Sequence, residues 1–157
     1  MRSTTEERVG MKLHRSVIER IASAAPEFID ITDEIIGAVR ASGVREGATT
    51  VFSRHTTAAV KINENEPLLL EDMAQFLEAA APREADYRHN DFTIRTANMT
   101  EDECPNGHSH CQHLLLSASE TIPVCDGELL LGRWQRVFLI ELDRPRLREV
   151  VIQVQGW

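Results

Sequence analysis

Residues 133–154, RWQRVFLIELDRPRLREVVIQV, decide the fold class of this chain. The first half is predicted to be one long strand over 133–143, because its side chains divide between two alternating faces. Alternate side chains of a strand point to opposite faces. One face is therefore expected to carry Trp134, Arg136, Phe138 and Ile140, and the other Gln135, Val137, Leu139 and Glu141. After a turn at 144–146, residues 147–154 alternate again and predict a final strand.

Four further segments have sequences typical of strands: 28–31, 48–53, 58–62 and 120–125. Asp126-Gly127 follows the last of them and is a strong hairpin signal. Two main helices are predicted, one from Thr32 as N-cap to Gly43 and one over 68–81 after Pro67. A shorter helix is expected over 107–118. The inward face of the 68–81 helix is expected to carry Leu69, Met73, Phe76, Leu77 and Ala80.

The order of these elements predicts an α+β fold, a mostly antiparallel β-sandwich-like sheet with two main helices. Residues 1–11 are expected to be a flexible tail, followed by a single domain over 12–157. Within residues 12–21, the apolar positions fit a helical stripe better than a strand. Residues 83–107 form a long polar loop in which only 92–94 suggest extended chain, and a loop of this length is usually functional or disordered.

Composition excludes several classes of protein. Asp and Glu number 25 against 17 Lys and Arg, for a net charge of −8, which argues against a nucleic-acid partner. No apolar run approaches the ~20 residues that span a bilayer, so no membrane partner is expected. The N-terminus lacks the apolar core of a signal peptide, and the three cysteines form no CxxC pair. A reducing cytoplasm is the expected location.

The six histidines offer two alternative metal sites. One is a local zinc site in the donor-rich loop, although its spacing matches no structural zinc pattern. The other is a catalytic site with three ligands from separate segments and one open position. The local set comprises Cys104, His108, His110, Cys111 and His113. The dispersed set comprises His55, His89 and His110, each in a turn-rich or loop-bounded segment.

Other polar residues near these histidines are candidates for binding and proton transfer. Asp91 follows His89 by two residues and Glu64 follows the 58–62 strand, so either carboxylate could move a proton. Both also have ordinary interpretations, as a loop acid and as part of a helix-entry turn. The candidate substrate-binding residues are Thr56, Thr57, Asn63, Asn65, Asn106, Trp134 and Gln135.

Four ordered motifs together resemble the YjbQ-like family, whose members are often labelled secondary thiamine-phosphate synthase enzymes. They are HTTAAVKINEN at 55–65, YRHND at 87–91, NGHSH at 106–110, and IPV at 122–124 leading to LGRWQ at 131–135. Arg146, Arg148 and the final VQG at 154–156 complete the pattern, so the resemblance covers nearly all of the chain from Lys12 onward. The chain departs from the family at Arg133, at Ser117 and in its extra Cys and His residues.

This resemblance implies a compact α+β fold, a homotrimer, and a strand rather than a helix at 12–21. It also implies that His55, His89 and His110 line a polar site near a subunit interface. If the protein is an enzyme, we expect these three imidazoles to hold a divalent metal, with zinc favoured by ligand type. A phosphorylated small molecule is the implied substrate, and the implied reaction joins a pyrimidine pyrophosphate to a thiazole phosphate. The same residues would also suit a metal-dependent hydrolase or lyase that acts on another phosphorylated metabolite. A non-catalytic trimeric module that binds a metal or an anion is the alternative to an enzyme.

Overall fold

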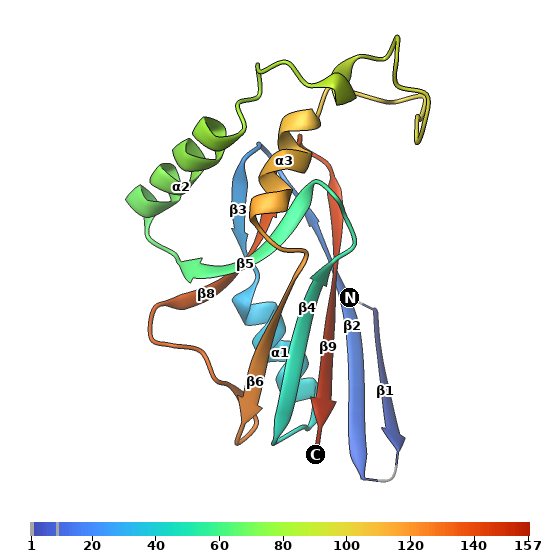
Figure 1. The fold of residues 1–157 in the computed structure, drawn as a ribbon. Helices are drawn as coiled ribbons and strands as arrows, with labels where there is room; N and C mark the ends of the chain where they lie inside the picture. Colours follow the sequence, from blue (N-terminus) through green and yellow to red (C-terminus); the bar gives the residue numbers. More distant parts are fainter. Residues whose placement is uncertain (1, 9) are drawn as a thin grey trace.

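The computed structural model describes residues 2–8 and 10–157, with side chains described from residue 10 onward. It contains nine strands, three α-helices and one short 3₁₀ helix among these residues (Figure 1). The strands are β1 (Arg2–Arg8), β2 (Met11–Ile21), β3 (Glu27–Asp30), β4 (Gly47–Ser53), β5 (Ala58–Glu64), β6 (Ser119–Cys125), β7 (Glu128–Leu129), β8 (Gln135–Glu141) and β9 (Leu147–Gly156). The helices are α1 (Thr32–Ser42), α2 (Pro67–Ala80), η1 (Arg88–Asn90) and α3 (Gly107–Leu115).

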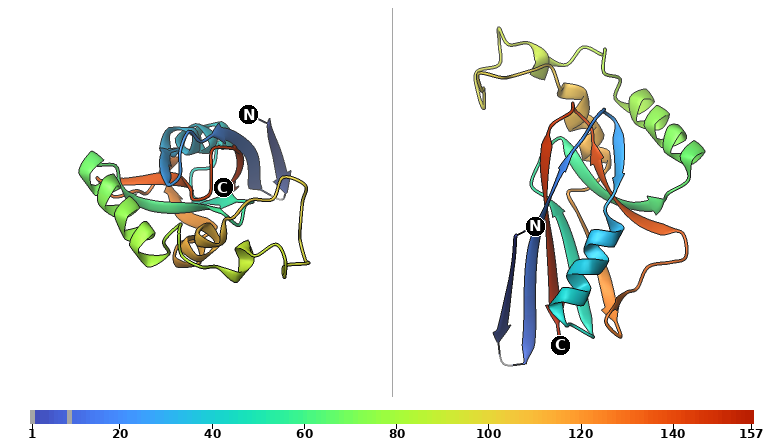
Figure 2. Two further views of the ribbon diagram at one scale, coloured as in Figure 1. Left: turned by 90° about the horizontal axis from the view of Figure 1, so that it is seen from above. Right: turned by 180° about the vertical axis from the view of Figure 1, so that it is seen from behind.

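The strands form two antiparallel sheets, which confirms the predicted α+β class. The larger sheet has the order β1-β2-β9-β4-β6-β7, and the smaller has the order β3-β8-β5. Helix α1 covers one face of the larger sheet, as the view from behind in Figure 2 shows. The main core lies between the two sheets and α1, and it includes Val51, Ile152, Leu139 and Ile35.

Strand β8 is buried on both of its faces, and this explains its apolar sequence. Val137 and Leu139 belong to the main core, whereas Phe138 and Ile140 join a second cluster with Leu77 of α2. The predicted division of these side chains between two faces is therefore confirmed. Because both layers need β8, residues 137–140 are almost inaccessible.

Strand β2 settles the conflict between the local pattern and the family resemblance. It pairs with β9 over residues 12–21, with His14 opposite Val154 and Ser16 opposite Ile152. The helical interpretation of 12–21 was wrong because this strand buries two polar side chains, His14 and Ser16, along with Ile18. A hydropathy pattern counts those two polar residues as exposed and so misses the alternation.

The helix ends follow the predicted chemistry with one correction. Pro67 begins α2, and Gly43 adopts a left-handed conformation (φ 64°) after α1. Thr32 is not the N-cap of α1 but its first residue. Its hydroxyl donates to Asp30 Oδ1 and accepts from Val137 N, so it ties the helix to β3 and β8.

The apolar face of α2 is far more exposed than predicted. Of the five residues expected to point inward, only Leu77 is buried, and Phe76 is 66% exposed. Leu70 and Leu77 of α2 pack against Phe138 and Ile140 of β8, whereas Leu68 and Phe76 are exposed. Figure 2 shows α2 at the outer edge of the molecule.

The remaining expectations concern turns and the N-terminal segment. Asp126 and Gly127 both have positive φ, which confirms the tight hairpin between β6 and β7. Residues 92–94 form turns rather than extended chain. Residues 2–8 form β1, paired with β2, within the segment that was expected to be a tail. No helix among the described residues combines the length and the apolar character needed to cross a bilayer.

Candidate functional site

An open cleft of about 690 Å³ lies where the β4–β5 turn, the loop before α3 and the start of β9 meet. We call it the histidine cleft because His55, His89 and His110 all line it. Four arginines also line it: Arg54, Arg95, Arg146 and Arg148. The lining includes a single carboxylate, Glu103, which is paired with Arg95 at 3.1 Å. The cleft is therefore cationic in a chain of net charge −8.

His89 and His110 lie side by side in the cleft. Their ring centroids are 4.7 Å apart with an interplanar angle of 68°. Burial lowers the pKa of His110, and the neighbouring His89 lowers it further. The Nε2 atom of His89 is buried and has no hydrogen-bond partner among the described residues. Two adjacent imidazoles, one with an unused buried nitrogen, are the arrangement that a shared cation would stabilise.

A close interlock between η1 and α3 holds this pair together. Asn90 Oδ1 accepts a hydrogen bond from Gly107 N at 2.8 Å, which satisfies a free N–H group at the start of α3. A Cβ at Gly107 would lie 2.6 Å from the Cβ of Tyr87, so glycine is required for this approach. The predicted motifs at 87–91 and 106–110 thus pack against each other.

His55 lies in the same cleft but is oriented by a different contact. Its Nε2 accepts a hydrogen bond from Glu149 N at 2.9 Å, so the neutral ring carries its proton on Nδ1. Burial and the nearby Arg148 lower the pKa of His55 and favour this neutral form. In this arrangement His55 has no lone pair free for a metal, whereas His89 and His110 do.

In this structure the ring nitrogens of the three histidines do not all lie within 4.8 Å of one another. Among the described residues, the one group of three His, Cys, Asp or Glu ligands within 4.8 Å of one another is Glu46, Cys125 and Asp126, all exposed. The local zinc alternative, which spans 104–113 and lies mostly on α3, is likewise not assembled. Cys104 contacts Asp143 at 3.8 Å, and Cys111 is exposed.

The predicted anion-binding residues next to His55 do line the cleft. Thr56 is exposed there, and the buried Thr57 accepts a hydrogen bond on Oγ1 from Arg148 Nη2 at 3.0 Å. Asn106 is 7% exposed, and its Oδ1 has no partner among the described residues. This oxygen is a further unused acceptor in the wall that carries His110.

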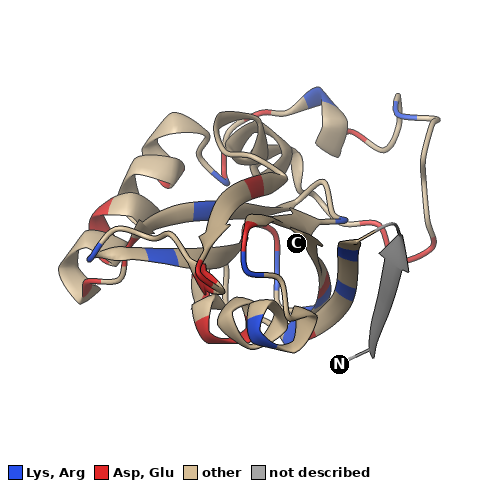
Figure 3. Ribbon diagram, turned by 90° about the horizontal axis from the view of Figure 1, so that it is seen from below, with Lys and Arg blue, Asp and Glu red and all other residues tan. Residues whose placement is uncertain are grey.

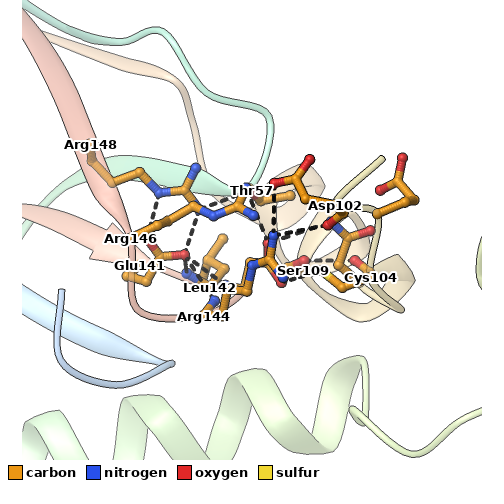
Figure 4. Close-up of polar contacts among 12 residues, drawn as sticks. Thr57, Asp102, Cys104, Ser109, Glu141, Leu142, Arg144, Arg146 and Arg148 are labelled. Carbon is orange, nitrogen blue, oxygen red and sulfur yellow. Dashed lines mark hydrogen bonds and ion pairs between the residues drawn. The ribbon is translucent and has the colours of Figure 1, made fainter. Parts of the chain in front are cut away.

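A buried ion pair that was not predicted joins Glu141 and Arg148 (Figure 4). The Glu141 carboxylate accepts from Arg148 at both oxygens, at 2.5 and 2.6 Å. Both side chains are almost wholly buried, at 0% and 3% exposed. A lone acid within the apolar run VFLIEL was the signal that could have found it, because a buried acid needs a partner.

Five predicted residues lie at the other end of β5 and β8. Glu64 pairs in register with Gln135, and because β5 is extended, they lie about 20 Å from the β4–β5 turn. Gln135 Oε1 accepts from Gly132 N at 2.7 Å, and Trp134 is 61% exposed with Arg133 stacked 4.5 Å from its ring centroid. The residues in this distant group are Asn63, Glu64, Asn65, Trp134 and Gln135. None of them lines the histidine cleft.

Asp91, the other predicted proton carrier, is also absent from the cleft wall. Its Oδ1 accepts hydrogen bonds from Thr93 N at 3.0 Å and Thr93 Oγ1 at 2.6 Å, closing a local turn. These hydrogen bonds lower the pKa of Asp91 and favour the charged form. In this position, Asp91 shapes the loop after His89.

Comparisons with known proteins agree with the fold. The family model described as UPF0047 protein YjbQ-like matches residues 18–157. A UPF0047 protein of Methanothermobacter thermautotrophicus is 39% identical over 148 residues, covering 94% of this chain and 96% of that protein. The Bacillus subtilis UPF0047 protein YugU is 32% identical, covering 83% of this chain and 90% of that protein.

Solved structures give the same result. A YbjQ-like protein of unknown function from Sulfolobus solfataricus superposes with a TM-score of 0.84 at 32% identity, covering 94% of this chain and 99% of the other. A YjbQ/UPF0047 protein from Clostridium acetobutylicum gives a TM-score of 0.78 at 34% identity, covering 88% and 98%. The chain belongs to the YjbQ-like UPF0047 family.

Proposed function

We propose that the histidine cleft is the active site of a metal-dependent enzyme that acts on a phosphorylated small molecule. The observation that carries this proposal is the cationic lining of the cleft, four arginines against one paired carboxylate, around the His89–His110 pair. Arginine guanidinium groups match the geometry of phosphate oxygens. The overall acidity of the chain does not oppose this, because a small anion responds to local charge.

His89 and His110 are the residues that fit a divalent metal. Their imidazoles are adjacent, and the unpartnered Asn106 Oδ1 is a further neutral donor in the same wall. Zinc is favoured by the nitrogen ligands. When bound, it would act as a Lewis acid toward a phosphoryl oxygen. His55 does not fit as a ligand here, since its Nε2 is held by Glu149.

Thiamine-phosphate synthesis is the specific reaction that we carry forward from the family resemblance, as a main or side activity. It requires binding of a pyrimidine pyrophosphate and stabilisation of the departing pyrophosphate. The arginines of the cleft suit that role, because departure of the pyrophosphate increases negative charge on its oxygens. His55, neutral and with an N–H on Nδ1, can donate a hydrogen bond to such an oxygen.

A non-catalytic module that binds a metal or an anion remains the second candidate. One observation favours it: neither Asp91 nor Glu64, the predicted proton carriers, lines the cleft. A binding module needs the histidines and arginines but no general base. Turnover therefore decides between the two candidates.

We also propose that the protein is a homotrimer in the cytoplasm. Large apolar side chains on the outer faces of α2 and α3 support an assembly, because monomers rarely expose such patches. The most exposed of them are Leu68, Phe76, Leu114 and Leu115. The three cysteines are unpaired, as a reducing compartment would keep them.

Metal analysis of the purified protein tests the site. We expect up to one ion per chain by elemental analysis, and we expect His89→Ala and His110→Ala each to lower that occupancy by about 10-fold or more. His14→Gln, in β2 outside the cleft lining, should retain the ion. Full occupancy in both cleft variants would refute the metal assignment.

Pyrophosphate release from the two thiamine precursors tests the reaction. We expect turnover in the wild type and its loss in His110→Ala with the fold intact by circular dichroism. A protein that binds metal and phosphate but turns over no phosphorylated substrate would favour the binding module instead.

A further inference from the structure

Arg148 is held by its partners so that one nitrogen remains available to the cleft. Its Nε and Nη2 atoms donate to Glu141, and Nη2 also donates to Thr57 Oγ1. Among the described residues, Nη1 has no hydrogen-bond partner, and it is not one of the fully buried unpaired atoms. Arg148 lines the cleft. With the side chain 3% exposed, this nitrogen is a fixed donor at the base of the cleft.

The Glu141 carboxylate that holds Arg148 is itself held by the backbone. Its Oε1 accepts from the backbone N–H groups of Leu142 at 3.1 Å, Asp143 at 2.9 Å and Arg144 at 3.3 Å. Three main-chain donors and the two nitrogens of the guanidinium thus hold this carboxylate, and Figure 4 shows Glu141 and Arg148 within this cluster of polar contacts. The guanidinium therefore requires little reorganisation when it meets an anion.

His55 is held by Glu149, the residue that follows Arg148 on β9. Glu149 N donates to its Nε2, so in the neutral ring Nδ1 carries a proton. Nδ1 has no partner among the described residues, and His55 lines the cleft beside Arg148. Consecutive residues of β9 thus supply one donor, Arg148, and orient another, His55.

We propose that Arg148 Nη1 and His55 Nδ1–H, together with the Thr56 hydroxyl, form a pre-organised subsite for the phosphoryl group of the ligand that does not depend on the metal. All three groups can donate, and the one lining carboxylate is occupied by Arg95. Arg95 is bound to Glu103 at 3.1 Å and is 13% exposed. Arg54 is more loosely held, since it is 60% exposed and pairs with Glu149 at 3.3 Å. Arg54 attracts the anion, whereas Arg148 and His55 hold it. The phosphoryl identity of the ligand rests on the proposed function.

A charge-neutral double variant tests the subsite. Glu141→Gln with Arg148→Gln keeps an acceptor for the three backbone N–H groups and leaves the net charge unchanged. Calorimetric titration with inorganic phosphate is expected to show binding about 10-fold weaker or more than in the wild type. The matched control is Arg45→Gln with Asp126→Asn, which neutralises an exposed ion pair outside the cleft and should bind phosphate as the wild type does.

Arg148→Lys covers the case in which the double variant does not fold. It keeps the positive charge beside Glu141 but loses the planar guanidinium with its several N–H donors. We therefore expect weaker phosphate binding with a circular dichroism spectrum like that of the wild type. His89→Ala with His110→Ala, which lacks the proposed metal ligands, should still bind phosphate. Wild-type affinity in a folded Arg148 variant would overturn the inference, as would loss of phosphate binding in the histidine double variant alone.

Metal occupancy separates this inference from the proposed function. The subsite variants should hold as much metal as the wild type, because none of their substitutions touches His89 or His110. If no variant holds metal but phosphate binding still depends on Arg148, the subsite stands and the metal-dependent enzyme does not. If metal and turnover are present but the Arg148 variants bind phosphate as the wild type does, the metal-dependent enzyme stands and the subsite does not.

Discussion

Gly47 and Gly156 face each other across β4 and β9 at a point where neither residue has room for a side chain. A Cβ at Gly47 would lie 2.0 Å from Gln155 O and 2.8 Å from Gly156 Cα. Both obstacles are backbone atoms, so a larger residue must push the strands apart. We expect Gly47→Ala to lower the free energy of unfolding by about 1–3 kcal/mol, measured by urea denaturation.

Gly37 provides the matched control for that substitution. It lies inside α1, and a Cβ there would meet nothing within 4 Å. Gly37→Ala should therefore raise the free energy of unfolding by about 0.5–1 kcal/mol, because alanine is the better helix former. Equal denaturation midpoints for the two variants would contradict this account.

At the scale of elements, Asp30 joins β3, α1 and β8. Its Oδ1 accepts from Thr32 N at 3.0 Å and from Thr32 Oγ1 at 2.7 Å, and its Oδ2 accepts from Arg136 Nε at 2.8 Å. Burial alone would raise the pKa of Asp30. The hydrogen bonds from Arg136, Thr32 and Asn65 outweigh burial and leave the pKa below its ordinary 3.8.

This lowered pKa predicts how stability depends on pH. Because the folded pKa of Asp30 lies below that of the unfolded chain, its contribution is fully present above the unfolded value. It is lost as the pH falls through the folded pKa. The difference in unfolding free energy between wild type and Asp30→Asn should shrink from about pH 6 to about pH 3. A difference that stayed constant or grew over that range would refute the linkage. Asp72→Asn, an exposed acid of α2, controls for the lost charge.

Elements were predictable from the sequence where apolar periodicity and burial agree. The hairpin at Asp126-Gly127 was found because glycine and aspartate tolerate the positive φ that it needs. β2 was misassigned on local grounds because His14 and Ser16 occupy buried positions. For the same reason Glu141 was read as one more residue of a strand face, although its buried charge sets the position of Arg148.

At the scale of the whole molecule, the motifs could be recognised in the sequence, but which of their residues lie close together in space could not be predicted. His55 and Glu64 belong to one continuous motif, yet the extended conformation of β5 separates them by the length of the strand. His89 and His110 are far apart in sequence, yet the contact between Asn90 and Gly107 brings them together. Only tertiary contacts decide which end of a strand meets which loop.

The expected absence of a nucleic-acid partner stays a prediction that rests on the net charge of −8. Figure 3 shows where the Lys, Arg, Asp and Glu residues of the described chain lie along the ribbon. One group of exposed apolar side chains lies around α2 and α3, where a hollow of about 200 Å³ is lined by Met73, Phe76 and Leu115, among others. Apolar hollows rimmed by exposed leucines are typical of protein interfaces.

The proposed homotrimer gives this surface its test. Phe76 is 66% exposed on α2, so a charge at this position should change the stability of the folded monomer little. In a trimer interface the same charge would be buried without a partner and would oppose assembly. We expect the wild type to sediment as a trimer and Phe76→Glu to sediment as a folded monomer. Ile21→Glu introduces the same charge at an apolar residue that is 76% exposed at the end of β2, and it should remain trimeric. A Phe76→Glu protein that stays trimeric would place the interface elsewhere, and a wild type that sediments as a monomer would refute the assembly itself.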